Sequence, residues 1–217
     1  MLMGRRFAEL AFTPLVKAQQ EKHGSRKAYM RVEQSFISGS DLGPDEQQMI
    51  RTRDSFYMAS VSESGWPYVQ HRGGPKGFLH VLDEQTIGFA DLRGNKQYIS
   101  LGNLQHDDRV TLFLMDYPSQ SRLKILGHAE FHEDDVTAHE LLETLRMPEE
   151  KTPAERIVLI HVEAFDWNCQ QHITPRYTQE EIAEIFEPMR RRIDALEKEN
   201  ARLRAAQPPS SLIAQTD

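Results

Sequence analysis

The sequence predicts a mainly β protein, an antiparallel β-barrel with flanking helices and a C-terminal helical extension. About seven short apolar segments separated by turn residues lie between residues 55 and 165. Few helical segments interrupt them, whereas a parallel sheet needs a crossover helix after nearly every strand. The hairpin at residues 78–90 leaves no room for such a crossover. We therefore expect an antiparallel barrel.

The pattern also places each element along the chain. Residues 5–35 are predicted to be helical and then irregular, and Pro44 opens a short helix with Asp45 and Glu46 in its first turn. Further helices are expected after Lys96 and over residues 134–145. The predicted strands are 56–61, 66–70, 78–82, 86–90, 110–115, 123–131 and 156–165.

Four regions follow from this order of elements. Their predicted bounds are an N-terminal helical segment packing on the barrel (1–50), the barrel domain (51–176), a C-terminal helix (177–206) and a flexible tail (207–217). In the C-terminal helix, Thr178 and Glu181 form a capping-box pattern, and Pro188 is expected to kink or restart the helix.

The C-terminal helix carries apolar residues at alternating steps of three and four. A polar Asn200 interrupts this series, as register-setting Asn residues do in dimeric coiled coils. The seam is shorter than the three to four heptads that make a coiled coil a firm prediction. A coiled coil and an amphipathic helix folded back on its own barrel both remain open. The seam residues are Phe186, Met189, Ile193, Leu196, Asn200 and Leu203.

Composition excludes several classes of protein. The formal net charge is −7, with 33 acidic residues scattered among 26 basic ones, which argues against nucleic acid as a partner. No apolar run approaches the roughly 20 residues that span a bilayer, so no membrane segment is expected. The single cysteine, Cys169, fits a reducing cytoplasm. His128 and His132, four apart in a strand, do not form a zinc pattern, and no metal site is expected.

The segment 88–98, Gly-Phe-Ala-Asp-Leu-Arg-Gly-Asn-Lys-Gln-Tyr, is the most informative for chemistry. A strand ends there, Gly94 makes a tight turn, and Asn95 is expected to cap a helix that begins at once. Free amides at a helix start favour an anion, and glycine lets a ligand approach the backbone. Lys96 in the first helical turn would oppose the helix dipole unless it serves an anion. An ordinary exposed turn is the alternative.

Several motifs in register connect this segment to a known family. The segments "GFADLRGNK", "DDRVTLFL" and "RLKILGHAE" follow a strand that ends in a basic residue, and a glycine-rich connection reaching Phe78. In this order they resemble the pyridoxamine 5′-phosphate oxidase-like family of FMN-binding split β-barrels. The resemblance covers roughly residues 50 to 176.

The resemblance implies a cofactor, FMN, and a role for each matching residue. Lys96 and Arg72 would hold the FMN phosphate, with Gly94 and Asn95 offering further donors. Arg122 would lie near the pyrimidine edge of the flavin, where a cation stabilises negative charge on the reduced ring. The cofactor-binding set that the resemblance implies is Arg72, Phe78, Phe89, Ala90, Asp91, Gly94, Asn95, Lys96, Arg122, Trp167 and Arg176.

A homodimer is also implied. In the family, a Trp and an Arg at places comparable to Trp167 and Arg176 reach the flavin that is bound mainly by the other subunit. The flavin would then lie at the subunit interface, and the site would exist only in the dimer. For Trp167, packing in the core is the alternative.

The expected function is an FMN-dependent oxidoreductase acting on a small molecule, with a nicotinamide as one candidate electron donor. The oxidases' Tyr–Arg–Ser substrate set has no counterpart in residues 134–146, which offer His139, Thr144 and Arg146. We therefore expect a substrate other than pyridoxamine phosphate, and no catalytic residue is assigned. A non-catalytic flavin sensor or carrier, and a barrel that binds deazaflavin or haem, are the alternatives; His71 and His172 are the local candidates for a haem ligand.

Overall fold

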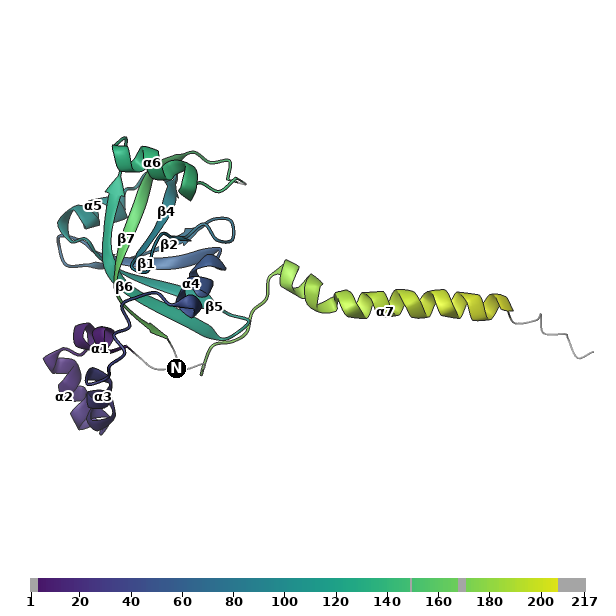
Figure 1. Cartoon of the computed structure of the whole chain (residues 1–217), viewed down its shortest axis with the longest axis horizontal. Coiled ribbons are helices and arrows are strands. Elements are labelled where there is room, and N and C mark those ends of the chain that lie inside the picture. The colour runs from purple at the N-terminus through teal and green to yellow at the C-terminus, as the bar shows by residue number, and fades with distance from the viewer. Residues whose placement is uncertain (1–3, 149, 168–170, 207–217) are drawn as a thin grey trace, which may run out of the picture. The chain divides into compact units, whose positions relative to one another are not determined.

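The computed structural model describes residues 4–148, 150–167 and 171–206. The chain divides into two compact units, residues 1–174 and residues 175–217 (Figure 1). The first unit contains the sheet and six helices, and the second contains one long helix. The predicted tail, 207–217, lies outside the described residues, as does Cys169.

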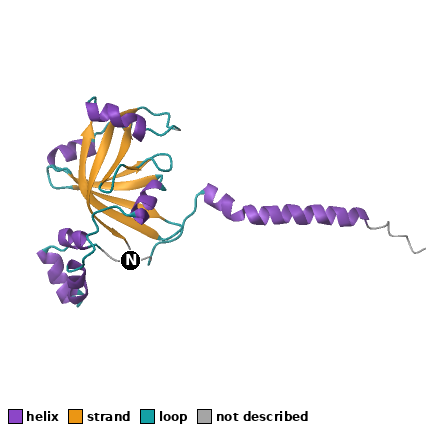
Figure 2. Ribbon diagram, viewed as in Figure 1, coloured by secondary structure: helices purple, strands orange, loops and turns teal. Residues whose placement is uncertain are grey.

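Seven antiparallel strands form one strongly curved sheet in the order β2-β1-β5-β6-β7-β4-β3 (Figure 2). Every recorded strand pair is antiparallel, so the predicted fold class is confirmed. The strands are β1 (Ser55–Val61), β2 (Pro67–Gly73), β3 (His80–Val81), β4 (Thr86–Leu92), β5 (Arg109–Asp116), β6 (Ser121–His132) and β7 (Ala154–Trp167).

Side-chain alternation gives the sheet one apolar inner face. On β5, Val110, Leu112 and Leu114 are buried while the residues between them are partly exposed. Phe56, Phe78 and Phe89 meet in the barrel interior, with ring centroids 5.5–6.2 Å apart. Such aromatic contacts stabilise the core beyond their buried area. This packing joins β1 to β4, which lie far apart in the strand order.

The two ends of the strand order also meet through charged side chains. Arg72 on β2 forms an ion pair with Asp91 on β4, next to the edge strand β3. The sheet thus curls into a barrel that is split between β2 and β4. Side chains link these two strands across the split. Ile87, Phe89 and Asp91 alternate along β4 and are all buried, which places Asp91 at the end of the apolar interior.

Helices flank the sheet. Residues 5–33 form three helices rather than one segment, because Pro14 at the start of the second and Gly24 with φ +75° after it interrupt the chain. α6 packs on the outer face of β4 and β7 through Leu145, Ile157 and Leu159. The helices of this unit are α1 (Arg5–Ala11), α2 (Pro14–Lys22), α3 (Arg26–Glu33), α4 (Pro44–Arg51), α5 (Ile99–His106) and α6 (Val136–Leu145).

The second unit consists mainly of α7 (Gln179–Ala206). The predicted capping box is confirmed: the Thr178 amide donates to Glu181 at 2.8 Å, and the Glu181 amide donates to the Thr178 hydroxyl at 3.2 Å. α7 is continuous through Pro188, so the helix does not restart there. Among the described residues, no helix combines the length and apolarity needed to cross a membrane.

Candidate functional site

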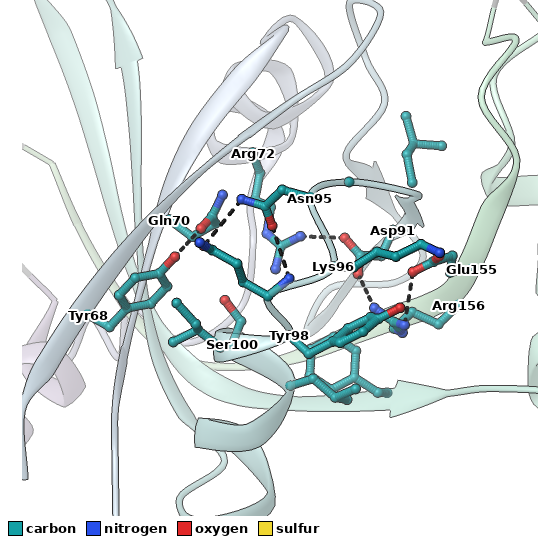
Figure 3. A pocket seen from close by; sticks show the side chains of 16 residues that line it. Tyr68, Gln70, Arg72, Asp91, Asn95, Lys96, Tyr98, Ser100, Glu155 and Arg156 are labelled. Atoms are coloured by element: carbon teal, nitrogen blue, oxygen red, sulfur yellow. Dashed lines mark hydrogen bonds and ion pairs between the residues drawn. The ribbon is translucent and has the colours of Figure 1, made fainter. Parts of the chain in front are cut away.

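A pocket of about 200 Å³ lies between β2, the loop after β4 and the start of α5 (Figure 3). Its wall combines cationic, amide and hydroxyl groups with a few apolar side chains. Five of the predicted cofactor residues line it: Arg72, Asp91, Gly94, Asn95 and Lys96. The other lining residues are Tyr68, Gln70, Leu92, Gln97, Tyr98, Ile99, Ser100, Leu101, Phe131, Glu155 and Arg156.

Asp91 holds two arginines at the base of this pocket. Its carboxylate accepts hydrogen bonds from Nη1 of Arg72 and, at 2.9 Å, from Nη1 of Arg156 (Figure 3). Asp91 and Arg156 are direct partners in the β4–β7 register, so strand pairing alone brings these charges together. The Asp91 side chain is 8% exposed and that of Arg156 is 9% exposed. Asp91 therefore positions cations and is itself unsuited to contact an anion.

The two arginines are anchored differently. Burial alone would lower the pKa of Arg156, but its bond to Glu133 at 2.5 Å and the charges of Asp91 and Glu133 raise that pKa above its ordinary value. Arg72 lies with its guanidinium carbon 5.8 Å from the ring centroid of Phe89. Its Nε is buried and has no hydrogen-bond partner among the described residues. A buried donor without a partner is costly, which makes Arg72 a candidate to receive an acceptor from a ligand.

The loop between β4 and α5 carries Lys96 in an unusual backbone conformation. Lys96 has φ +60° and Tyr98 has φ +54°, in the left-handed region that non-glycine residues seldom adopt. Such conformations cluster at ligand-binding sites. Lys96 is exposed and makes no hydrogen bond or ion pair within the described parts of the chain. Its ammonium is therefore available to a ligand.

The expected helix start is wrong by several residues. α5 begins at Ile99, so Lys96 precedes the helix, and Asn95 does not cap it. The Asn95 side chain instead accepts from the amide of Gln97 at 3.1 Å and stabilises the loop. The left-handed conformation of Tyr98, the residue before the helix, prevents the helix from starting earlier.

The first turn of α5 nonetheless faces the pocket. Ile99, Ser100 and Leu101 line it, and the preceding residue, Tyr98, supplies no side-chain cap. Uncapped amides at a helix N-terminus carry a partial positive charge and point outward along the helix axis. Together with Lys96, they make this end of the pocket suited to a phosphate.

Three predicted residues do not line this pocket. Phe78 is 7% and Phe89 1% exposed, and both side chains pack in the barrel core. Ala90 points to the opposite face of β4 from Phe89 and lines a small apolar cavity of about 20 Å³ beside Leu145. The structure therefore gives the Phe78 and Phe89 side chains a packing role.

Two further predicted residues lie at the other end of the sheet. Arg122 is nine residues before the pocket residue Phe131 on β6 and points to the opposite face of that strand from the buried Leu123. Its guanidinium carbon lies 5.6 Å from the ring centroid of Phe113. Trp167 pairs with Leu123, packs against the core and donates from Nε1 to Glu46 at 2.5 Å. One chain alone does not bring these residues to the pocket.

Arg176 belongs to the second unit, residues 175–217. Its placement relative to the pocket therefore stays a prediction.

The sequence pattern missed several residues of the pocket. Arg156 is the most important, because it shares Asp91 with Arg72 and places its guanidinium carbon 5.3 Å from the ring centroid of Tyr98. Its only sequence signal is a cation in an otherwise apolar strand. Tyr68 and Gln70 alternate with Val69 on β2 and face the pocket with Arg72. No group of three or more His, Cys, Asp or Glu suited to a metal occurs in the described residues.

The fold is a curled antiparallel split barrel, and its pocket carries cationic side chains beside a helix N-terminus. A family model described as pyridoxamine 5′-phosphate oxidase matches residues 42–168, more than half of the chain. The chain belongs to this family. No curated protein matches it.

Similar solved structures come from several bacteria. One from Lactobacillus delbrueckii, provisionally named a pyridoxamine 5′-phosphate oxidase, has 23% identity, covering 58% of this chain and 94% of that one, with a TM-score of 0.47. HupZ of Group A Streptococcus has 16% identity, 62% and 99% coverage, and a TM-score of 0.47. An FMN-binding protein from Syntrophomonas wolfei has 13% identity, 69% and 97% coverage, and a TM-score of 0.44.

Proposed function

We propose that this protein binds FMN, with the phosphate at the start of α5. The observation that carries the proposal is the pocket itself, where an unpaired Lys96, the uncapped amides of α5 and the orphaned Nε of Arg72 converge. These groups fit a phosphate dianion, and the neighbouring Gln70 and Tyr68 offer polar contacts to a ribityl chain. Family membership supports the same ligand.

The size of the pocket supports a site shared between two copies of the chain. Pockets that enclose a ligand of cofactor size measure about 300–1,000 Å³, whereas this pocket measures about 200 Å³. It can hold the phosphate and part of the ribityl chain. The flavin ring then needs a wall that the same protomer does not supply.

An exposed apolar surface on β1 and β2 offers that second wall. Tyr57 is 42%, Val61 38% and Val69 60% exposed, on the outer face of the sheet. Tyr57 pairs with Phe113 of β5, whose ring lies against Arg122. Contiguous exposed apolar surface commonly marks a protein interface. A two-fold homodimer through this face would bring Arg122 of one copy toward the pocket of the other.

The shared site predicts complementation between two inactive variants. Lys96→Ala removes the phosphate contact of one chain, and Arg122→Ala removes the ring contact that it gives to its partner. Both variants are expected to bind FMN weakly alone. After unfolding and refolding as an equal mixture, about one quarter of all sites should recover wild-type affinity, because each mixed dimer has one intact site. If both residues serve the flavin of their own chain, mixing restores nothing.

The proposed activity is that of a flavin-dependent oxidoreductase acting on a small molecule other than pyridoxamine phosphate. FMN would supply the hydride and electron chemistry. The chain would supply position and charge: Lys96 and α5 hold the phosphate, Arg122 stabilises negative charge at the reduced pyrimidine edge, and Trp167 and Arg176 close the site from the partner. Such a site needs no protein general base. A nicotinamide donor and a cytoplasmic location remain part of this proposal.

A flavin-binding sensor or carrier is the second candidate, because the same pocket groups, Lys96, Arg72 and the α5 amides, would hold FMN whether or not it turns over. Anaerobic addition of NADH or NADPH distinguishes the oxidoreductase from the sensor or carrier. Bleaching of the flavin absorbance, with recovery on adding an acceptor, supports the oxidoreductase. Tight FMN without reduction by any donor supports the carrier, and deazaflavin or haem binding remains the alternative if FMN does not bind.

A further inference from the structure

α7 carries an apolar seam along one side. No residue of the helix is buried, and six apolar residues along one side have exposed fractions between 44% and 58%. They recur at steps of four and three, which places them at the a and d positions of a heptad repeat. These residues are Ile182, Phe186, Met189, Ile193, Leu196 and Leu203.

We propose that α7 pairs in parallel with α7 of a second copy of this chain, as a two-stranded coiled coil. The seam continues through Asn200, which occupies an a position. β-branched Ile193 at a and Leu196 at d are the combination that favours two strands, and a single a-position Asn favours the same state. Pro188 falls at a c position, on the outer side of the helix, where its missing amide and its ring do not obstruct the seam.

The charges beside the seam fit this partner. With Asn200 at a, Arg192 and Glu199 occupy g positions, and Glu197 and Arg204 occupy e positions. In a parallel pair each g residue faces the e residue five positions later on the partner. Arg192 therefore meets the partner's Glu197, and Glu199 meets the partner's Arg204. All four side chains are exposed and form no ion pair within the described chain.

Asn200 determines whether the two copies of α7 pair in parallel or antiparallel. In a parallel pair it faces its own counterpart, and the two amides can bond to each other. In the antiparallel pair that best overlaps the seam, Asn200 faces Met189 and its amide is buried without a partner, which is unfavourable. The charges alone do not decide, because the antiparallel arrangement also pairs Arg192 with Glu199 and Arg190 with Glu197.

This coiled coil goes beyond the proposed flavin function and needs no flavin. A seam this short is marginal in isolation. A barrel that dimerises would hold two copies of α7 at millimolar effective concentration, which favours pairing of a short seam.

Disulfide capture in the full chain tests the pairing. In a Cys169→Ser background, Asn200→Cys places two thiols at facing a positions, and mild oxidation should give a covalent dimer on a non-reducing gel. Lys198→Cys is the matched control, because its f position lies on the outside of the pair. The inference is overturned if Asn200→Cys yields no more dimer than Lys198→Cys. The result does not depend on adding FMN, so failure here and failure of the flavin proposal are distinguishable.

Charge reversal tests the direction in a Cys169→Ser, Leu196→Cys protein, which keeps Asn200 and places two thiols at facing d positions of the parallel pair. Arg204→Glu should slow cross-linking about threefold to tenfold, since it opposes the partner's Glu199 in two places. Adding Glu199→Arg should restore the rate. Arg190→Glu should have little effect, because it faces Ile185 in the parallel pair but Glu197 in the antiparallel pair. A loss with Arg190→Glu and none with Arg204→Glu would contradict the parallel arrangement.

Discussion

A Lys96→Ala variant is expected to bind FMN about tenfold to a hundredfold more weakly than the wild-type protein. The exposed ammonium has no partner among the described residues, so its removal costs the fold little. Losing one charge-assisted hydrogen bond to a phosphate should reduce the binding free energy by roughly 1.5–3 kcal/mol. Quenching of flavin fluorescence during titration measures the difference in Kd.

Lys76→Ala is the matched control for this variant. Lys76 is also exposed, lies in the loop after β2, and does not line the pocket. The two variants change net charge equally, so a general electrostatic effect would weaken both. Equal affinity of Lys96→Ala and wild type would show that the phosphate binds elsewhere.

An Asp91→Ala variant is expected to lose about 3–5 kcal/mol of unfolding free energy. Removal of this carboxylate leaves Arg72 and Arg156 as neighbouring cations with little access to solvent, at 17% and 9% side-chain exposure. Breaking a buried ion pair on one side is strongly destabilising because the remaining charge is uncompensated. Arg72 then has no ion-pair partner among the described residues, whereas Arg156 keeps Glu133 and Glu155. Chemical denaturation followed by circular dichroism measures the change, as a lower midpoint at a similar slope.

Arg93→Ala tests whether the loss of stability expected for Asp91→Ala arises because the ion pairs of Asp91 are buried. The Arg93–Glu155 pair lies beside the same pocket at 3.9 Å, but the Arg93 side chain is 54% exposed. Exposed pairs contribute about 0–1 kcal/mol, so Arg93→Ala should change stability little. A comparable loss in both variants, or no loss with Asp91→Ala, would show that the Asp91 cluster does not hold the split of the barrel together.

The sheet could be predicted from sequence because its signal is local. Alternation such as Val110, Leu112 and Leu114 on β5 marks which side chains face the core, and turns such as 62–65 separate the strands. The capping box of α7 could be predicted for the same reason, since Thr178 and Glu181 are only three residues apart. Short-range rules suffice where the interaction itself is short in range.

Only part of the candidate site could be predicted from the sequence, because the site depends on contacts between residues that are far apart in the chain. Arg156 reaches Asp91 through a strand pairing across 65 residues, which no local pattern encodes. The start of α5 was misplaced since Asn95 looks like a cap, whereas the left-handed Tyr98 delays the helix to Ile99. The family resemblance implies that Phe89 lies along the flavin, whereas alternation along β4 turns its ring into the core.

The central claim is that this chain binds FMN, and titration of the purified full-length protein tests it most directly. The visible spectrum would be recorded first, without added cofactor, and FMN would then be titrated while flavin fluorescence is followed. The account predicts a yellow preparation or saturable binding of one FMN per subunit. A colourless protein that leaves FMN fluorescence unchanged throughout the titration would contradict it.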